Sequence, residues 1–235
     1  MEDFAKSLES TWKDSLFTVK EAESLNKRAK EYLYRLENAG RVERICWGWY
    51  CLPTDVKDPW TFLAKDKGFK VLIKQTASSF WNHDFVHRNV YRLAVENPSY
   101  KKVLEEFARK KGWIFEVEQH EDLRERFDYQ TIDGLFVEKP DSCIVNCTAD
   151  WSFLDAFATL YFRRDQVPLK RLKELGRWKR ISKTNVRVWT AVKYGCNLFN
   201  EHLDERTFNV RDTRLDREDV KELVEEAVEK VVEFA

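Results

Sequence analysis

Residues 17–53 read FTVKEAESLNKRAKEYLYRLENAGRVERICWGWYCLP, and this stretch decides the fold of the N-terminal part of the chain. Thr18 can cap a short helix, and Glu21 three residues later completes a capping box. Asn26 is a second capping residue that opens a longer helix. Gly40 is suited to the left-handed stop at the end of that helix. The stretch therefore predicts two helices separated by a tight turn.

A β-hairpin is expected directly after the second helix. The runs 42–45 and 49–52 are short and β-rich, and they flank a glycine-containing turn. Helix, tight turn, helix and hairpin is the order of a winged helix-turn-helix. Residues 1–16 would supply the first helix of this domain, through Phe4, Leu8 and Trp12.

The second helix carries the first set of candidate binding residues. A helix-turn-helix lays its second helix in the major groove of DNA. Long cationic side chains with a tyrosine among them can bond both phosphates and base edges. The residues expected to face outward are Lys27, Arg28, Lys30, Glu31, Tyr34 and Arg35, and all of them except Glu31 are expected to engage DNA. The alternative is a solvated helix face in a domain that contacts only protein.

The tip of the hairpin is the second candidate contact. With the turn at Trp47 and the following glycine, Cys46 faces Trp49 rather than Cys51, so a disulfide between the two cysteines would need distorted geometry. No second cysteine pair lies nearby to complete a zinc site. We therefore expect small apolar thiols in the hairpin, with Arg44 and Trp47 flanking a contact to DNA.

The same stretch resembles the N-terminal winged helix of the AbiEi-type antitoxins and related transcriptional regulators. The residues that carry the resemblance are the "FT" start, Glu43-Arg44-Ile45 and Gly48-Trp49-Tyr50. Further likeness lies in "TIDGLFVEKPDSCIVNC" and in the helices that follow it, so the resemblance spans about residues 16–203. The family usually has a basic residue where Trp47 stands.

The resemblance implies a function and partners. Members of the family repress their own operon, and many neutralise a partner toxin of the nucleotidyltransferase type. We therefore expect a sequence-specific DNA-binding regulator, with double-stranded DNA as its partner and two copies on an inverted repeat. The rival hypothesis is a protein-binding module that neutralises a toxin or docks in a complex, with a structural winged helix.

The remainder of the chain predicts an α+β domain. We expect a winged helix over residues 1–53 and a second domain over 54–235, with a small mixed sheet and a helical C-terminal half. The 41 basic and 41 acidic residues balance, so binding to DNA must come from local patches. The acidic N-terminus has no apolar signal core, and no run of about 20 apolar residues could span a membrane, so we expect a cytoplasmic protein.

Two late segments carry opposite charge. Residues 163–193 hold eleven Lys or Arg against two acids, with Trp178 and Trp189 interleaved. We expect this segment to hold phosphates through Arg177, Lys179, Arg180 and Lys183. The helix expected from Asp216 onward is acidic and amphipathic, so its apolar stripe must be buried on its own domain or on another subunit.

An enzyme is the third hypothesis. Asp128, Asp133, Glu138 and Lys139 could be taken for the metal cluster of a nuclease. Two-metal chemistry needs converging carboxylates, whereas adjacent residues such as Glu138 and Lys139 point to opposite faces of a strand. The sequence has no nucleophile elbow and no glycine-rich phosphate loop. We therefore predict no catalytic residue, metal or cofactor.

Overall fold

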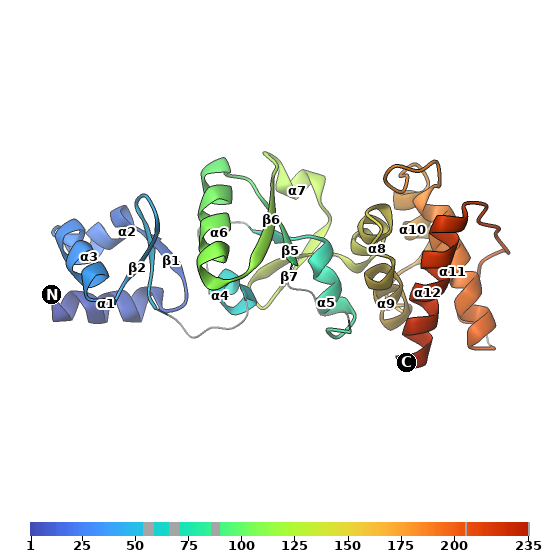
Figure 1. Cartoon of the computed structure of the whole chain (residues 1–235), viewed down its shortest axis with the longest axis horizontal. Coiled ribbons are helices and arrows are strands. Elements are labelled where there is room, and N and C mark those ends of the chain that lie inside the picture. Colours follow the sequence, from blue (N-terminus) through green and yellow to red (C-terminus); the bar gives the residue numbers. More distant parts are fainter. Residues whose placement is uncertain (54–58, 66–70, 86–89, 205, 235) are drawn as a thin grey trace. The chain divides into compact units, whose positions relative to one another are not determined.

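The computed structural model describes residues 1–53, 59–65, 71–85, 90–204 and 206–234 (Figure 1). Helices account for 54% and strands for 16% of the structure, so the expected mixed α+β class is confirmed.

The chain divides into two compact units. The first comprises Met1–Leu72, Asn89–Leu123 and Thr131–Phe136. The second comprises Ile73–Arg88, Arg124–Gln130 and Val137–Ala235. The domain boundary predicted between residues 53 and 54 stays a prediction.

The N-terminal part of the first unit combines three helices with a small sheet. Its elements are α1 (Glu2–Trp12), β1 (Leu16–Thr18), α2 (Val19–Leu25), α3 (Ala29–Asn38), β2 (Glu43–Cys46) and β3 (Trp49–Cys51). The sheet has the order β1-β3-β2, and both pairings are antiparallel. Strand β1 was not expected, because residues 1–16 were assigned to a helix that in fact ends at Trp12.

Local capping explains where the helices begin and end. Thr18 accepts a hydrogen bond from the Glu21 amide at 3.1 Å, and the Glu21 carboxylate accepts one from the Thr18 amide at 2.7 Å, so the capping box is confirmed. The Asn26 side chain accepts a bond from the Arg28 amide at 2.9 Å. Gly40 has a φ of +68°, the left-handed stop that the sequence predicted.

One expectation about α3 was wrong. The helix begins at Ala29 rather than directly after Asn26. The side chain of Asn26 instead bonds the chain two residues on, which holds Lys27 and Arg28 in the turn between the helices. These two cations therefore precede the helix on which they were placed.

The helices pack on the small sheet through one apolar cluster. Phe4 and Leu8 of α1 meet Phe17 of β1, and Leu33 and Leu36 supply the buried face of α3. Each fully buried side chain of this kind contributes roughly 1.5–3 kcal/mol. The cluster fixes which face of α3 points outward.

The middle of the chain forms a five-stranded sheet with the order β6-β5-β4-β8-β7. The elements here are α4 (Pro59–Lys65), β4 (Leu72–Ile73), β5 (Val90–Val95), α6 (Pro98–Lys111), β6 (Ile114–Gln119), α7 (Leu123–Arg126), β7 (Tyr129–Ile132) and β8 (Leu135–Glu138). Strands β5 and β6 are parallel, with α6 as their crossover. Asp133 and Gly134, both with positive φ, connect β7 to β8, and a two-residue turn joins antiparallel neighbours. The sheet is therefore mixed, as expected.

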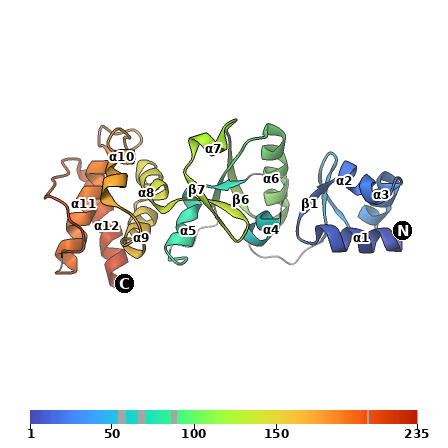
Figure 2. The ribbon, with the colours of Figure 1, turned by 180° about the vertical axis from the view of Figure 1, so that it is seen from behind.

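The second unit is mostly helical. Its helices are η1 (Gln75–Ala77), α5 (Ser78–Trp81), α8 (Pro140–Ala149), α9 (Phe153–Phe162), α10 (Leu169–Gly176), α11 (Val188–His202) and α12 (Glu218–Phe234). Helices α9, α11 and α12 lie side by side (Figure 2). Gly195 of α11 has no room for a Cβ, which would lie 2.1 Å from the Phe157 ring of α9. Helix α5 is short and ends at Trp81.

The apolar stripe of α12 is buried within its own unit. Val220, Val224, Ala227, Val228 and Val231 are all inaccessible to solvent or nearly so. These five side chains are therefore buried on the same unit, whereas Leu223 of the same stripe is 39% exposed.

Candidate nucleic-acid interface

The outward face of α3 is open to solvent. Tyr34 is 66% exposed, whereas its neighbour Leu33 and the later Leu36 are buried, as the helical period requires. The side chains of Lys30 and Arg35 are also largely exposed. Helix α3 thus presents a tyrosine between two cations on its solvent-facing side.

A glutamate in the middle of this face neutralises part of the positive charge there. Glu31 lies 2.7 Å from the guanidinium of Arg28 and 2.5 Å from that of Arg35. The hydrogen bond from Arg28 lowers the pKa of Glu31, so this carboxylate stays ionised at neutral pH. Lys30 pairs more loosely with Glu23, at 3.5 Å. Lys27 in the preceding turn is exposed.

The tip of the β2–β3 hairpin projects an aromatic side chain. Trp47 is 88% exposed, and the guanidinium of Arg44 lies 5.4 Å from the centre of its ring. The two candidate residues therefore form one cation–π pair. Cys46 lies opposite Trp49, as predicted from the turn.

The two cysteines of the hairpin are free thiols. Burial raises the pKa of Cys51 to about 12, and burial also raises the pKa of Cys46. Neither thiol has the lowered pKa that a reactive cysteine needs. Both thiols therefore stay protonated at neutral pH.

The hairpin is braced by α6 within the same unit. Lys111 of α6 forms an ion pair with Glu43 of β2 at 2.8 Å, and both side chains are partly buried. The rings of Trp49 and Tyr100 lie 5.7 Å apart. These contacts fix the hairpin on one side.

A second basic surface is the loop between α10 and α11, residues 177–187, which we call the basic loop. It closes on itself through an isolated β-bridge between Arg180 and Arg187. Two bonds anchor it to the segment between α8 and α9: the Ser182 amide donates to the Ala149 carbonyl at 2.8 Å, and the Trp151 indole donates to the Ser182 carbonyl at 2.9 Å. The loop is therefore an ordered part of the second unit.

Two guanidinium groups stack on one indole in the basic loop. Trp178 is 70% exposed, and the guanidinium carbons of Arg177 and Arg187 lie 4.6 and 5.5 Å from its ring centre. In the part of the chain that the structure describes, neither arginine has a carboxylate partner. Arg187 was missed as a site residue, and its only sequence signal was the tryptophan in the same basic run.

The other predicted cations of the loop are all exposed, but they differ in their hydrogen bonds. Lys179 donates to the Asn146 side chain, which in turn donates to Glu138. Arg180 donates to the Asn185 carbonyl at 2.8 Å. Lys183 is exposed, with a left-handed backbone. Lys179 and Arg180 thus bond within the protein, whereas Lys183 faces solvent.

Glu138, which accepts the hydrogen bond from the Asn146 side chain, is a buried carboxyl. Burial raises its pKa to about 7. One of its oxygens has no hydrogen-bond partner among the described residues. Desolvation lowers the pKa of Lys179, although the residue as a whole is exposed.

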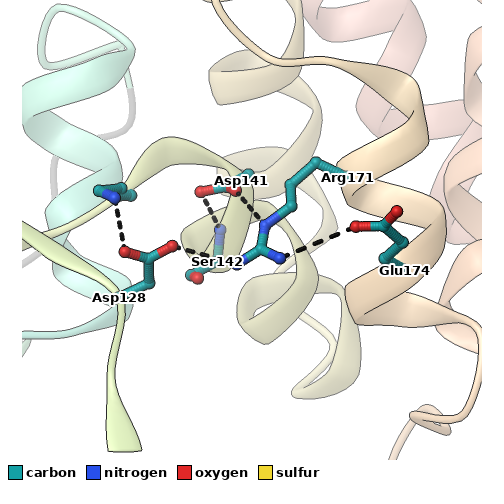
Figure 3. Close-up of polar contacts among 6 residues, drawn as sticks. Asp128, Asp141, Ser142, Arg171 and Glu174 are labelled. Atoms are coloured by element: carbon teal, nitrogen blue, oxygen red, sulfur yellow. Dashed lines mark hydrogen bonds and ion pairs between the residues drawn. The ribbon is translucent and has the colours of Figure 1, made fainter. Parts of the chain in front are cut away.

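Asp128, one of the carboxylates considered for a nuclease site, is engaged with cations (Figure 3). Asp128 lies 2.6 Å from the Lys139 ammonium and 3.2 Å from Arg171, which also contacts Asp141 at 3.3 Å and Glu174 at 3.8 Å. The hydrogen bond from Lys139 lowers the pKa of Asp128. Among the described residues, no three His, Cys, Asp or Glu side chains gather as metal ligands would.

Comparisons with known proteins leave the family open. No family model, no curated protein and no solved structure matches the chain. Within the described residues, no helix has both the length and the apolar character required to cross a bilayer.

Proposed function

We propose that the protein is a sequence-specific DNA-binding transcriptional regulator that uses its N-terminal part as a winged helix-turn-helix. The order of helices and strands and the β1-β3-β2 sheet support this proposal. The observation that carries it is the exposed face of α3, where Tyr34 stands between Lys30 and Arg35. A helix of this size fits the major groove.

Each predicted contact has a defined role in the proposal. Lys30, Tyr34 and Arg35 enter the major groove, where Arg35 is the side chain suited to a bidentate bond with guanine. Lys27 and Arg28, in the turn before α3, bond phosphates and position the helix. Arg44 and Trp47 contact the sugar-phosphate edge beside the groove; these two residues form the tip of the wing.

The basic loop adds phosphate contacts from the second unit. Arg177 and Lys183 reach the DNA backbone in this proposal, and Arg187 joins them. Lys179 and Arg180 support the loop through their internal bonds. Contacts of this kind add affinity without reading sequence.

The resemblance to AbiEi-type antitoxins suggests the form of regulation. It supports autorepression by two copies of the chain on an inverted repeat in the cytoplasm, with a toxin of the nucleotidyltransferase type as a further partner. The proposal assigns no catalytic residue and no cofactor.

The test uses the full chain and a duplex enriched by selection from random sequence. We expect the logarithm of the affinity to fall steeply with the logarithm of salt, by about 0.9 per phosphate contacted. The double variant Lys30→Glu/Arg35→Glu should lose about a hundredfold or more in affinity, because like charges then face the phosphates. The control Lys101→Glu/Arg109→Glu makes the same charge change on α6.

Two results would contradict the proposal. One is equal loss of binding in both double variants, which would indicate a response to net charge alone. The other is a wild-type chain that enriches no duplex. The rival function is binding of a protein through an apolar interface, with a structural winged helix, and it predicts an interaction that salt changes little.

A further inference from the structure

An open cavity of about 140 Å³ lies where the start of α9 meets α12. Its apolar walls are Trp151, Phe153, Leu154, Leu223 and Ala227. Leu223 is 39% exposed, although it belongs to a helix whose other apolar side chains are mostly buried. Glu226 and Lys230 complete the lining, so the cavity is apolar only in part. Its volume is close to the ~150 Å³ of a cavity that holds a benzene ring, which is about the size of one large apolar side chain.

The cavity wall is held in place before anything binds. The Trp151 indole N–H donates to the Ser182 carbonyl at 2.9 Å, and the ring packs edge-on against Phe153 at 5.9 Å. Because the wall is already ordered, binding against it loses little conformational entropy, which favours affinity.

A stripe of acidic side chains runs beside the cavity. Helical spacing places Glu222, Glu226, Glu229 and Glu233 on one line along α12, adjacent to the line of Leu223. Glu226 pairs with Lys230, which also lines the cavity. The other three acids have no cationic partner among the side chains that the structure describes.

We propose that this groove is a docking site for a basic segment of another protein, which inserts one large apolar side chain between Trp151 and Leu223. The acidic stripe selects a cationic partner and repels the phosphate backbone of nucleic acid. It also disfavours pairing of α12 with α12 of a second copy, since that would oppose like charges. The proposal is independent of DNA binding by α3.

The test measures binding of fluorescein-labelled twelve-residue peptides to the full chain by polarisation. One peptide has a central Trp flanked by Lys, a second has Ala at the centre, and a third has Glu in the flanks. We expect the Lys-flanked Trp peptide to bind about tenfold or more tightly than either of the others, because cavity filling and charge both contribute.

Two variants locate the binding. Leu223→Ser removes one wall, and Glu222→Gln/Glu229→Gln removes two acids without touching the cavity. Each should weaken the Lys-flanked Trp peptide about tenfold, whereas Glu105→Gln/Glu106→Gln on α6 should have no effect. The charge variant keeps the test decisive if Leu223→Ser fails to fold.

Three outcomes would overturn the proposal. The peptides with Trp and with Ala at the centre could bind equally tightly. The α12 variants could bind the Lys-flanked Trp peptide as tightly as the wild type does. Alternatively, sedimentation could show that the wild-type chain self-associates and that Leu223→Ser abolishes the association. That last result would assign the groove to a second copy of the chain.

Discussion

Each of the two basic surfaces has cations that bond a glutamate, directly in one case and through an asparagine in the other. The two glutamates also differ in burial and in the direction of their pKa shift. On α3, Glu31 lies at the surface and bonds two guanidinium groups directly, so its pKa is lowered. In the second unit, Glu138 is buried and reaches Lys179 only through Asn146, and burial raises its pKa. The first carboxylate neutralises cations at the surface, whereas the second holds one lysine against the protein.

The comparison teaches that a count of cations is a poor measure of available charge. On α3 and in the turn before it, two of the candidate arginines share one acid. In the basic loop, Arg177 and Arg187 are ordered by an indole instead, which leaves their charge available.

The buried and exposed faces of α3 should respond very differently to truncation. Leu33→Ala removes a fully buried side chain, so we expect a loss of about 2–5 kcal/mol in the free energy of unfolding. Tyr34→Ala next to it should leave thermal unfolding unchanged but weaken DNA binding. Calorimetry and anisotropy on both variants check this pair. A Tyr34→Ala variant as unstable as Leu33→Ala would mean that the face is structural.

The buried Glu138 should make stability depend on pH. Its folded pKa of about 7 exceeds the ordinary value of 4.5, so its contribution is fully present below pH 4.5 and is lost as pH rises to 7. At about 1.4 kcal/mol per pKa unit, the loss is about 3 kcal/mol. Glu138→Gln should remove that loss and be more stable than the wild type above pH 7. Chemical unfolding of both proteins at pH 5 and pH 8 gives their free energies of unfolding. If the free energies of the wild type and the variant changed by the same amount between the two pH values, the prediction would be contradicted.

In the basic loop, the two stacked arginines should matter most for DNA binding. Arg177→Ala/Arg187→Ala should reduce the slope of log affinity against log salt by about 2, one unit for each lost phosphate contact. Lys170→Ala/Lys173→Ala on α10 is the matched control, because it removes two exposed cations outside the loop. Equal slopes for the two double variants would show that the stacking on Trp178 has no functional role.

Breaking the ion pairs of Arg28 and Arg35 with Glu31 should give the smallest effect, and affinity should rise rather than fall. Glu31→Gln removes the shared acid, so Arg28 and Arg35 become free to bond phosphates and bases. We expect DNA affinity to rise severalfold at low salt, with the gain shrinking as salt screens the charges. Anisotropy titrations at two salt concentrations provide the measurement. A fall in affinity would indicate that Glu31 positions the arginines instead.

Local patterns in the sequence predicted local structure well. The capping box at Thr18, the stop at Gly40 and the pairing of Cys46 with Trp49 each depend on residues close together in the chain. Strand β1 could not be predicted in this way, because a three-residue strand has no measurable period and is defined by its pairing with β3.

It was harder to predict whether each cation bonds within the protein than to predict where it lies in the chain. Lys179 bonds Asn146, 33 residues earlier in the chain, and no local pattern reports that contact. Arg187 became a candidate only once its ring contact with Trp178 was known. Charge runs identify a basic segment, but tertiary contacts decide which of its side chains remain available.

Site-specific photocrosslinking tests the central claim most directly. A benzophenone amino acid replaces Tyr34 on α3 or Ile114 on β6, two side chains that are 66% and 55% exposed. With the selected duplex, position 34 should crosslink to DNA and position 114 should not. Crosslinking at 114 alone, or equally at both positions, would contradict entry of α3 into the groove.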